Sequence, residues 1–164
     1  MELKTAAEIR NLIRQTCERC GCPELASKIK YVWNSRFTRR MGDATYDFPN
    51  ATGVVRFSKP LWGRADLRER KNTIVHEVCH IITFYKYGKS ASPHGARWKK
   101  MMLLAGEFPE RCHNVDTNGL TRKQTKIQVR CGCSQKSVTK NMFTRMKNGS
   151  TYSCGTCNKE ISFL

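Results

Sequence analysis

The stretch His-Glu-Val-Cys-His at residues 76–80 constrains the fold more than any other feature of this chain. It lies within a run, residues 66–86, whose apolar side chains recur at helical spacing, so we predict one long helix there. Histidines four residues apart lie on one face of a helix, with Cβ atoms about 5–6 Å apart. The sequence therefore predicts that His76 and His80 bind one metal ion from a single helical face.

Glu77 stands between the two histidines, beside the predicted metal rather than in line with it. From there a carboxylate can take a proton from an attacking water and pass it to a leaving amine. Zinc suits this arrangement because it makes water reactive near neutral pH. The alternative interpretation is a pair of surface histidines on an amphipathic helix. We favour a catalytic zinc site with Glu77 as general base and then acid.

A catalytic zinc needs a third protein ligand and one open position. Three residues downstream are candidates: His94 at the start of the next predicted helix, Glu107 at its end, and His113 beyond it. Their spacing alone does not choose among them.

Four cysteines near the C-terminus form two pairs, Cys131-Gly-Cys133 and Cys154-Gly-Thr-Cys157. Four thiolates in a short polar segment are typical of a closed structural zinc site. Such a segment has little core of its own, and zinc contributes about 10–16 kcal/mol to folding small zinc modules. The surrounding basic residues are typical of a nucleic-acid-binding ribbon or of a solvated face: Arg122, Lys123, Lys126, Arg130, Lys136, Lys140, Arg145, Lys147 and Lys159.

The remaining cysteines and the large aromatic residues are predicted to serve mainly in packing. Cysteines 17, 20 and 22 form a cluster, two of which fall on the apolar stripe of a first helix, and Cys79 lies inside the long helix. Cys112 is assigned no role, and its neighbour His113 has none beyond that of a candidate metal ligand. Four aromatic residues are candidates for stacking on bases, although core packing is favoured: Trp33, Phe37, Trp62 and Trp98.

The chain carries a formal charge of +17, from 30 Lys or Arg against 13 Asp or Glu. An excess of this size favours an anionic partner, with DNA or another nucleic acid as the first candidate. The N-terminus lacks a signal-peptide pattern, and no stretch reaches the length of a membrane span. We therefore expect an intracellular, cytoplasmic or DNA-associated protein with no membrane contact, whose reduced cysteines hold zinc rather than form disulfides.

Capping and turn residues outline the other elements. Residues 5–8, T-A-A-E, form a capping box that opens a first helix. Strands are expected at about residues 30–37 and 53–58, with a segment of turn residues between them, and the second strand is a candidate edge for pairing with a substrate. Ser92 and Pro93 predict the start of a third helix that runs to about residue 105.

The blocks H-E-V-C-H at 76–80, S-P-H-G-A-R-W-K-K-M-M at 92–102 and E-F-P-E-R-C-H at 107–113, with the C-terminal cysteine pairs, resemble the SprT-like family of zinc metallopeptidases. The resemblance implies that His94 is the third zinc ligand. It also implies a helix ahead of a small antiparallel sheet, then the active-site helix and a third helix. A eukaryotic member of the family degrades proteins crosslinked to DNA, so the resemblance raises the same role here.

We therefore predict an α+β chain with a zincin-like metallopeptidase core at 1–115 and a four-cysteine zinc ribbon at 120–164, holding one catalytic and one structural zinc ion. The predicted activity is endopeptidase cleavage of protein substrates, possible targets being proteins bound to DNA. The group that stabilises the oxyanion is open among Tyr46, Tyr85 and Arg97. The alternatives are a metal-dependent nuclease, favoured by the charge, and a non-catalytic nucleic-acid-binding protein with two structural zinc sites. An intact Glu77 argues against both.

Overall fold

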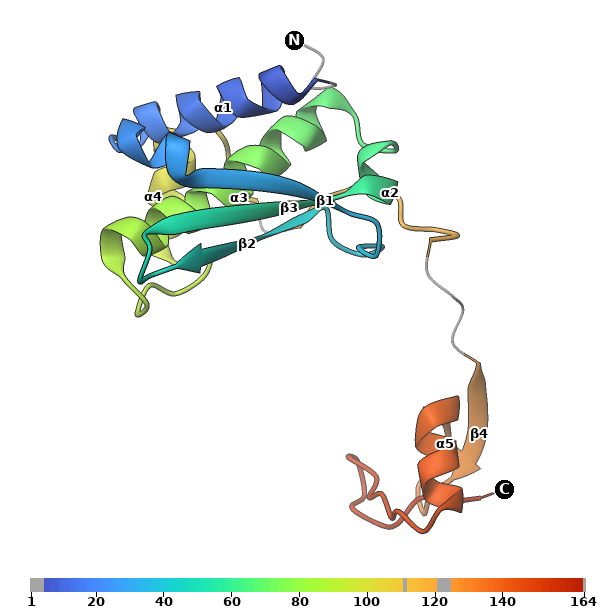
Figure 1. Cartoon of the computed structure of the whole chain (residues 1–164). Helices are drawn as coiled ribbons and strands as arrows, with labels where there is room; N and C mark the ends of the chain where they lie inside the picture. Colours follow the sequence, from blue (N-terminus) through green and yellow to red (C-terminus); the bar gives the residue numbers. More distant parts are fainter. Residues whose placement is uncertain (1–4, 111, 121–124, 164) are drawn as a thin grey trace. The chain divides into compact units, whose positions relative to one another are not determined.

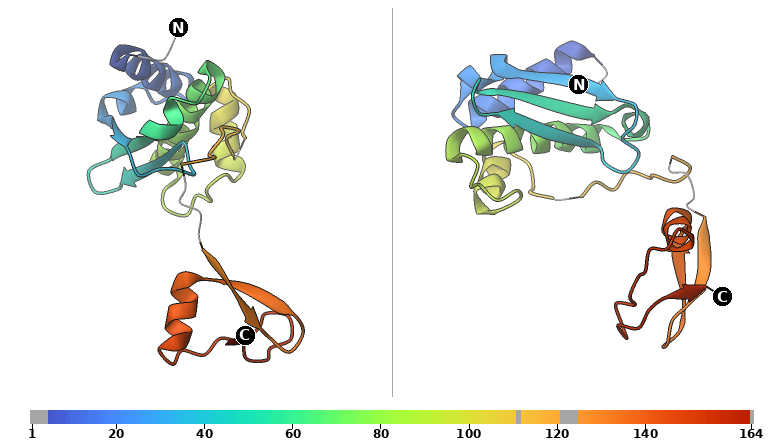
Figure 2. Two further views of the ribbon diagram at one scale, coloured as in Figure 1. Left: turned by 90° about the vertical axis from the view of Figure 1, so that its right-hand side faces the viewer. Right: turned by 60° about the horizontal axis from the view of Figure 1, so that its bottom comes forward.

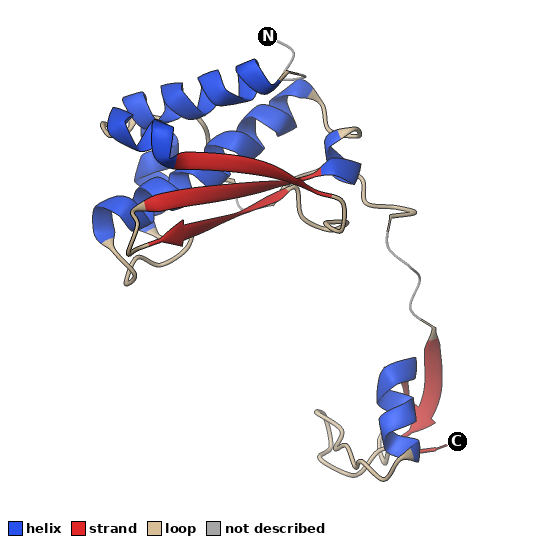
Figure 3. Cartoon of the chain, viewed as in Figure 1, coloured by secondary structure: helices blue, strands red, loops and turns tan. Residues whose placement is uncertain are grey.

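The computed structural model describes residues 5–110, 112–120 and 125–163. The chain divides into two compact units, Met1–Thr121 and Arg122–Leu164, here called the core unit and the ribbon unit. Helices and strands are both present, as expected for an α+β protein (Figure 3). The elements of the core unit are, in order, α1 (Ala6–Arg19), the 3-10 helix η1 (Pro23–Lys28), β1 (Ile29–Asn34), β2 (Gly42–Asp47), β3 (Thr52–Ser58), α2 (Lys59–Trp62), α3 (Leu67–Tyr87) and α4 (Ala96–Leu104).

Helix α1 begins at the predicted capping box and ends in a tight turn. The Thr5 hydroxyl accepts a hydrogen bond from the Glu8 amide, and the Glu8 carboxylate accepts one from the Thr5 amide. At the other end Gly21 takes a left-handed conformation (φ 67°), and the Cys22 amide donates to the Cys17 carbonyl over 3.0 Å. This is a Schellman ending, which packs the residue after the glycine against the last turn of the helix.

The core sheet has the order β1-β3-β2, with β1 parallel and β2 antiparallel to β3. The expected purely antiparallel sheet is therefore wrong, and so is the expected edge at residues 53–58, because β3 is the central strand. Strand β2 lies in the segment that the sequence predicted as turn. Its sequence, G-D-A-T-Y-D, contains glycine and two aspartates, which are depleted in strands, so pairing with β3 rather than local propensity makes it a strand.

The helices cover one face of the sheet (Figure 1). Helix α3 packs against β2 and β3, and α1 and α4 pack on α3. The approach is closest at Gly53, where an added Cβ would lie 2.7 Å from the Ile81 side chain. The core between these layers includes Ile9, Leu12, Val55, Phe57, Ile74, Val78, Ile82, Trp98 and Met101.

Helix α4 starts three residues later than predicted. Its N-cap is Gly95, not Ser92, and its first residue is Ala96. Residues 92–95 form a turn instead, closed by the Gly95 amide donating to the Ser92 carbonyl over 3.1 Å, with His94 in a left-handed conformation (φ 58°). The turn carries the His94 side chain out of the helix that the sequence had assigned to it.

The ribbon unit contains β4 (Lys126–Arg130), β5 (Gln135–Thr139), α5 (Lys140–Lys147) and β6 (Ser162–Phe163), as Figure 2 shows. Its strands pair antiparallel in the order β5-β4-β6. Its buried apolar side chains are few: Val129, Val138 and Met146, with Met142, Phe143, Tyr152 and Ile161 partly covered around them. A core this small is typical of a module that needs additional stabilisation.

Candidate metal centres

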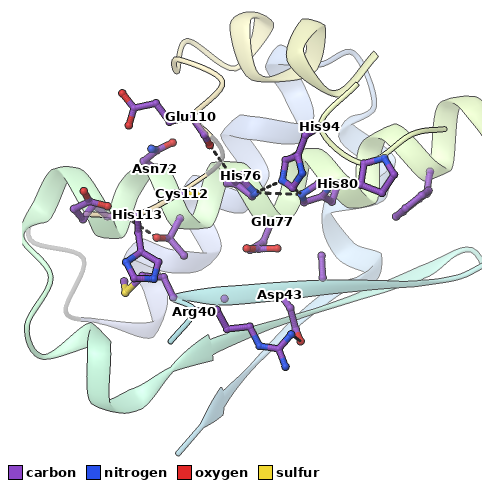
Figure 4. A pocket seen from close by; sticks show the side chains of 17 residues that line it. Arg40, Asp43, Asn72, His76, Glu77, His80, His94, Glu110, Cys112 and His113 are labelled. Atoms are coloured by element: carbon purple, nitrogen blue, oxygen red, sulfur yellow. Dashed lines mark hydrogen bonds and ion pairs between the residues drawn. The ribbon is translucent and has the colours of Figure 1, made fainter. Parts of the chain in front are cut away.

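The structure brings three histidines together on the core unit (Figure 4). His76 and His80 lie one turn apart on α3, and His94 reaches them from the turn before α4. Their Nε2 atoms lie 3.0 Å (His76 to His94), 3.2 Å (His80 to His76) and 3.1 Å (His80 to His94) apart.

The two rival ligands are engaged elsewhere. Glu107 forms an ion pair with Lys71 at 2.6 Å. In His113, Nδ1 accepts from the Val115 amide over 3.2 Å, so Nε2 carries the proton and donates to the Arg39 carbonyl over 3.0 Å. Neither belongs to the group of side chains that could share one metal ion, which consists of His76, His80 and His94.

This histidine set fits zinc. Four tetrahedral ligands at zinc–nitrogen distances of 2.0–2.1 Å lie about 3.3 Å from one another, close to the spacings found. His76 Nδ1 lies 3.1 Å from the Glu110 carbonyl, the kind of hydrogen bond that orients a zinc-binding imidazole. Burial lowers the pKa of His76 to about 4 and that of His80 to about 3, with the neighbouring histidines adding to the effect. Both rings are therefore neutral, as metal ligands must be.

Trp98 forms the floor of this site. Its side chain is fully buried, and its ring centroid lies 4.7 Å from those of His76 and His94 and 5.4 Å from that of His80. The indole Nε1 also donates to the His76 carbonyl over 3.4 Å. Core packing, the favoured use of this tryptophan, is confirmed, and the ring limits how the three imidazoles can turn.

Glu77 points from α3 toward strand β2, beside the histidine set (Figure 4). Its side chain is buried, and β2 comes close to it at Gly42, where an added Cβ would lie 3.0 Å from Glu77 Cγ. Burial raises the pKa of Glu77 to about 8; Asp43 adds to the increase, while Arg40 and Arg56 oppose it. A cation held by the three histidines would favour the charged form of this carboxylate.

The histidines and Glu77 open into a cleft of about 380 Å³. One wall is Met41 with the first residues of the edge strand β2, and the opposite wall is α3 with Glu110, Cys112 and His113. Tyr46, Tyr85 and Arg97, the sequence candidates for the oxyanion, do not line it. Tyr85 donates to Glu24 over 2.7 Å, and the Arg97 guanidinium lies over the Tyr87 ring.

Several cleft residues were not singled out from the sequence. Asn72 stands four residues before His76, on the same face of α3, and its Oδ1 is buried with no hydrogen-bond partner among the residues that the structure describes. That helical spacing could have identified it. Arg40 also lines the cleft, and it pairs with Asp43 at 3.4 Å. Cys112 lines the cleft too and is exposed.

The other core cysteines behave as predicted. Cys17, Cys20, Cys22 and Cys79 are all buried and belong to the apolar core. The packing of Cys22 against the last turn of α1 follows from the Schellman ending described above. Among the aromatic residues Trp62 is buried and Phe37 half-buried, but Trp33 is 44% exposed, so core packing alone does not describe it.

The four cysteines of the ribbon unit also come together. The Cys131 sulfur lies 3.1 Å from that of Cys133 and 3.6 Å from that of Cys154, and Cys133 and Cys154 are 3.8 Å apart. Cys157 belongs to the same group. Thiolates bound to zinc at about 2.3 Å lie about 3.8 Å apart, so this set also fits zinc.

The predicted basic residues of the ribbon unit are mostly exposed. Lys136 is half-buried, and Lys147 lies over the Phe143 ring at 5.3 Å. Arg122 and Lys123 lie outside the described residues. The exposed members are Lys126, Arg130, Lys140, Arg145, Lys147 and Lys159.

On this helix-covered sheet, His76, His80 and the buried Glu77 lie on α3, and His94 lies in the turn before α4. This arrangement defines the class of proteins with a candidate metal site on a helix. Residues 9–119 match the sequence model of the SprT-like family, and the chain belongs to that family. The match ends before the first ribbon cysteine, so the family match covers the core unit alone.

Individual relatives agree. Protein SprT of Pseudomonas fluorescens (strain SBW25) is 27% identical over 113 residues, which are 67% of this chain and 68% of that protein. Protein SprT of Pseudomonas putida (strain GB-1) is 29% identical over 107 residues, which are 63% of this chain and 64% of that protein.

Within the part of the chain that the structure describes, no helix has both the length and the apolar character that crossing a membrane requires.

Proposed function

We propose that the chain is a zinc-dependent metalloendopeptidase whose core unit has a zincin-like active site. The observation that carries the proposal is the set of three imidazole nitrogens 3.0–3.2 Å apart with the carboxylate of Glu77 in the same cleft. A structural zinc site is closed by four protein ligands. Three histidines that open onto a cleft leave one position for a reactant.

The chemistry follows from these side chains. His76, His80 and His94 would hold a zinc ion, whose Lewis acidity would polarise a peptide carbonyl and activate water. Glu77 accepts the proton of the attacking water and transfers it to the leaving amine. The Glu110 carbonyl holds His76 in one orientation, and the buried Trp98 supports all three rings. Asn72 and Arg40 line the cleft, and we expect them to contact the substrate.

The edge strand β2 offers a way to hold an extended substrate. One side of β2 pairs with β3, and its other side is not paired within the described sheet. Its first residues line the cleft beside Glu77. An extended peptide that adds to this edge would bind through main-chain hydrogen bonds, which are largely independent of sequence. The substrate class we propose is therefore protein, and the charge of +17 supports proteins bound to DNA.

The comparison of wild type with Glu77→Gln tests this function. Glutamine keeps the size of the side chain but cannot accept the proton, so proteolysis of a denatured protein should fall by at least about 100-fold. Zinc content and melting temperature should not change. Glu18→Gln, an exposed glutamate on α1, is the matched control and should cleave like wild type.

The same variants separate the alternatives. A nuclease would cleave nucleic acid in the wild type and leave protein intact, and a non-catalytic binding protein would cleave neither. Both substrates should therefore be offered, each with and without DNA. Proteolysis by Glu77→Gln at the wild-type rate would refute the assigned role of this residue.

A further inference from the structure

An exposed aromatic and basic surface lies at one end of the core sheet and includes none of the three histidines. It is formed by Trp33 at the end of β1, Arg36 and Arg39 in the following turn, and Lys59 at the start of α2; these four residues are called the Trp33 surface. Figure 1 shows the end of β1 beside α2 and this turn. The side chain of Trp33 is 44% exposed, whereas Trp62 and Trp98 are buried.

Strand pairing and one hydrogen bond bring together the segments that carry the four residues. Trp33 is paired with Phe57 in the parallel ladder, and its ring lies 5.1 Å from that of Trp62 on α2. The Ser58 hydroxyl donates to the Phe37 carbonyl over 2.6 Å, which ties the turn to the residue preceding Lys59. The indole is therefore held in place before any ligand arrives, which lowers the entropic cost of stacking on it.

The charges on this surface are available to a ligand. Arg36, Arg39 and Lys59 are exposed, and within the described residues none of them forms an ion pair. Residues 34–42 contain three arginines and no acidic residue. Asp43, the first acidic residue after the turn, is already paired with Arg40 and Arg56.

We propose that the Trp33 surface binds single-stranded nucleic acid, with a base stacked on Trp33 and phosphates held by Arg36, Arg39 and Lys59. An exposed aromatic ring within a set of unpaired cations is the combination used for single strands, because every base has a face that can stack. A duplex hides those faces, and an acidic peptide would satisfy the cations but leave the indole without a flat partner.

The Trp33 surface lies close to the cleft in the chain, so a strand bound there could bring a protein substrate to the active site. This connection rests on the proposed peptidase function. The turn that carries Arg36 and Arg39 continues directly into Arg40, Met41 and Gly42, which line the cleft. The Arg39 carbonyl also accepts the hydrogen bond from His113, another cleft residue. A protein attached to a strand held here would lie near the catalytic site.

Two readouts on the full-length chain test the proposal, with labelled oligo(dT) as the probe. The first is intrinsic tryptophan fluorescence: oligo(dT) should quench it in the wild type but not in Trp33→Phe, which retains an aromatic ring and most of the affinity. The second is affinity by fluorescence anisotropy. Trp33→Ala should weaken binding at least about fivefold. Phe108→Ala, at an exposed aromatic between two glutamates, should not.

The role of the three cations is tested by removing their charges and measuring how the affinity for oligo(dT) depends on salt. Replacing Arg36, Arg39 and Lys59 by serine should reduce the slope of log affinity against log salt by up to about 2, because each phosphate of a single strand that is no longer neutralised removes about 0.7. The matched control removes three other exposed cations that form no ion pair with any described residue, Arg10, Lys99 and Lys100, and should retain more of the slope.

The proposal is overturned if the two triple variants bind alike and Trp33→Phe is still quenched. It is also overturned if a duplex of equal length, or poly-glutamate, binds at least as tightly as oligo(dT). Should Trp33→Ala fail to fold, the phenylalanine and serine variants decide the matter. No proteolysis is measured, so this surface and the peptidase can fail separately.

Discussion

At the scale of single residues, Gly42 permits the close approach of strand β2 to Glu77. An added Cβ would lie 3.0 Å from Glu77 Cγ, 3.2 Å from its Oε1 and 3.0 Å from the Arg56 carbonyl. Gly42→Ala should therefore displace the carboxylate and lower stability by about 1–3 kcal/mol, the usual effect of overpacking. We expect proteolysis to fall by more than the folded fraction does, with zinc retained. Initial rates, elemental analysis and thermal melting measure the three quantities.

The control for this prediction is Gly63→Ala. The nearest atom to its added Cβ is 3.9 Å away, and its backbone is helical, so alanine fits without strain. Equal activity of the two variants would show that the contact between Gly42 and Glu77 does not matter for catalysis.

His94 contributes the only ligand of its set that does not come from α3. His94→Ala should lose the core zinc and all proteolysis, because two imidazoles remain where catalytic zinc needs three protein ligands. The left-handed backbone is accessible to alanine in this chain, since Ala51 has φ 51°. Elemental analysis should fall from two zinc ions to one. His113→Ala, which removes the nearby rival histidine, should retain both.

Sequence reasoning identified residues whose chemistry follows from a fixed spacing, and it failed where tertiary contacts decide. His76, Glu77 and His80 share one helix, so their relation could be read from the sequence. His94 needed the family resemblance, because its left-handed turn has no strong local signal. The role of Gly42 could not be predicted, because it depends on the close approach of strand β2 to Glu77 on helix α3, a contact between residues far apart in the sequence.

At the scale of elements, the same distinction separates the helices from the sheet. Capping residues and apolar periodicity gave α1 and α3 to within two residues. The strand β2 was missed because its pairing with β3 is a long-range contact that overrides poor local propensity. The start of α4 was misplaced because Ser92 and Pro93 imitate a helix start while the chain closes a turn there.

The ribbon unit should depend on its metal as an element of structure. Its buried core is small, and zinc contributes about 10–16 kcal/mol to folding in comparable modules, so we expect the unit to need a bound metal ion to fold. Cys154→Ser should lose one zinc ion, and amides of β4 and β5 should exchange at rates typical of an unfolded chain. The core zinc and proteolysis of a small peptide should persist. Thr151→Ser, in the same segment, is the control. Protected β4 and β5 amides in the metal-free variant would contradict this dependence.

At the scale of the whole molecule, positive charge is spread over both units. Residues 122–164 contain nine Lys or Arg and a single acidic residue. Most of the described cations of this unit are exposed. The ribbon unit and the Trp33 surface therefore offer two candidate nucleic-acid sites, one with a stacking ring and one argued from charge alone.

These two sites should contribute independently to the affinity for single strands. Replacing Lys126, Lys140, Arg145 and Lys147 by serine should weaken binding equally for all base sequences, since phosphate contacts carry no sequence information. The salt slope should fall by about 0.7 for each phosphate that the variant no longer neutralises. Tryptophan quenching should survive, because Trp33 is untouched.

Combining these changes with the serine variant of Arg36, Arg39 and Lys59 should give additive losses of binding free energy, as for mutations that share no partners. A combined loss no larger than that of either variant would mean that both sets of cations bind the same stretch of phosphates. If the ribbon variant binds like wild type, the basic residues of the ribbon unit do not bind nucleic acid and are only a solvated surface.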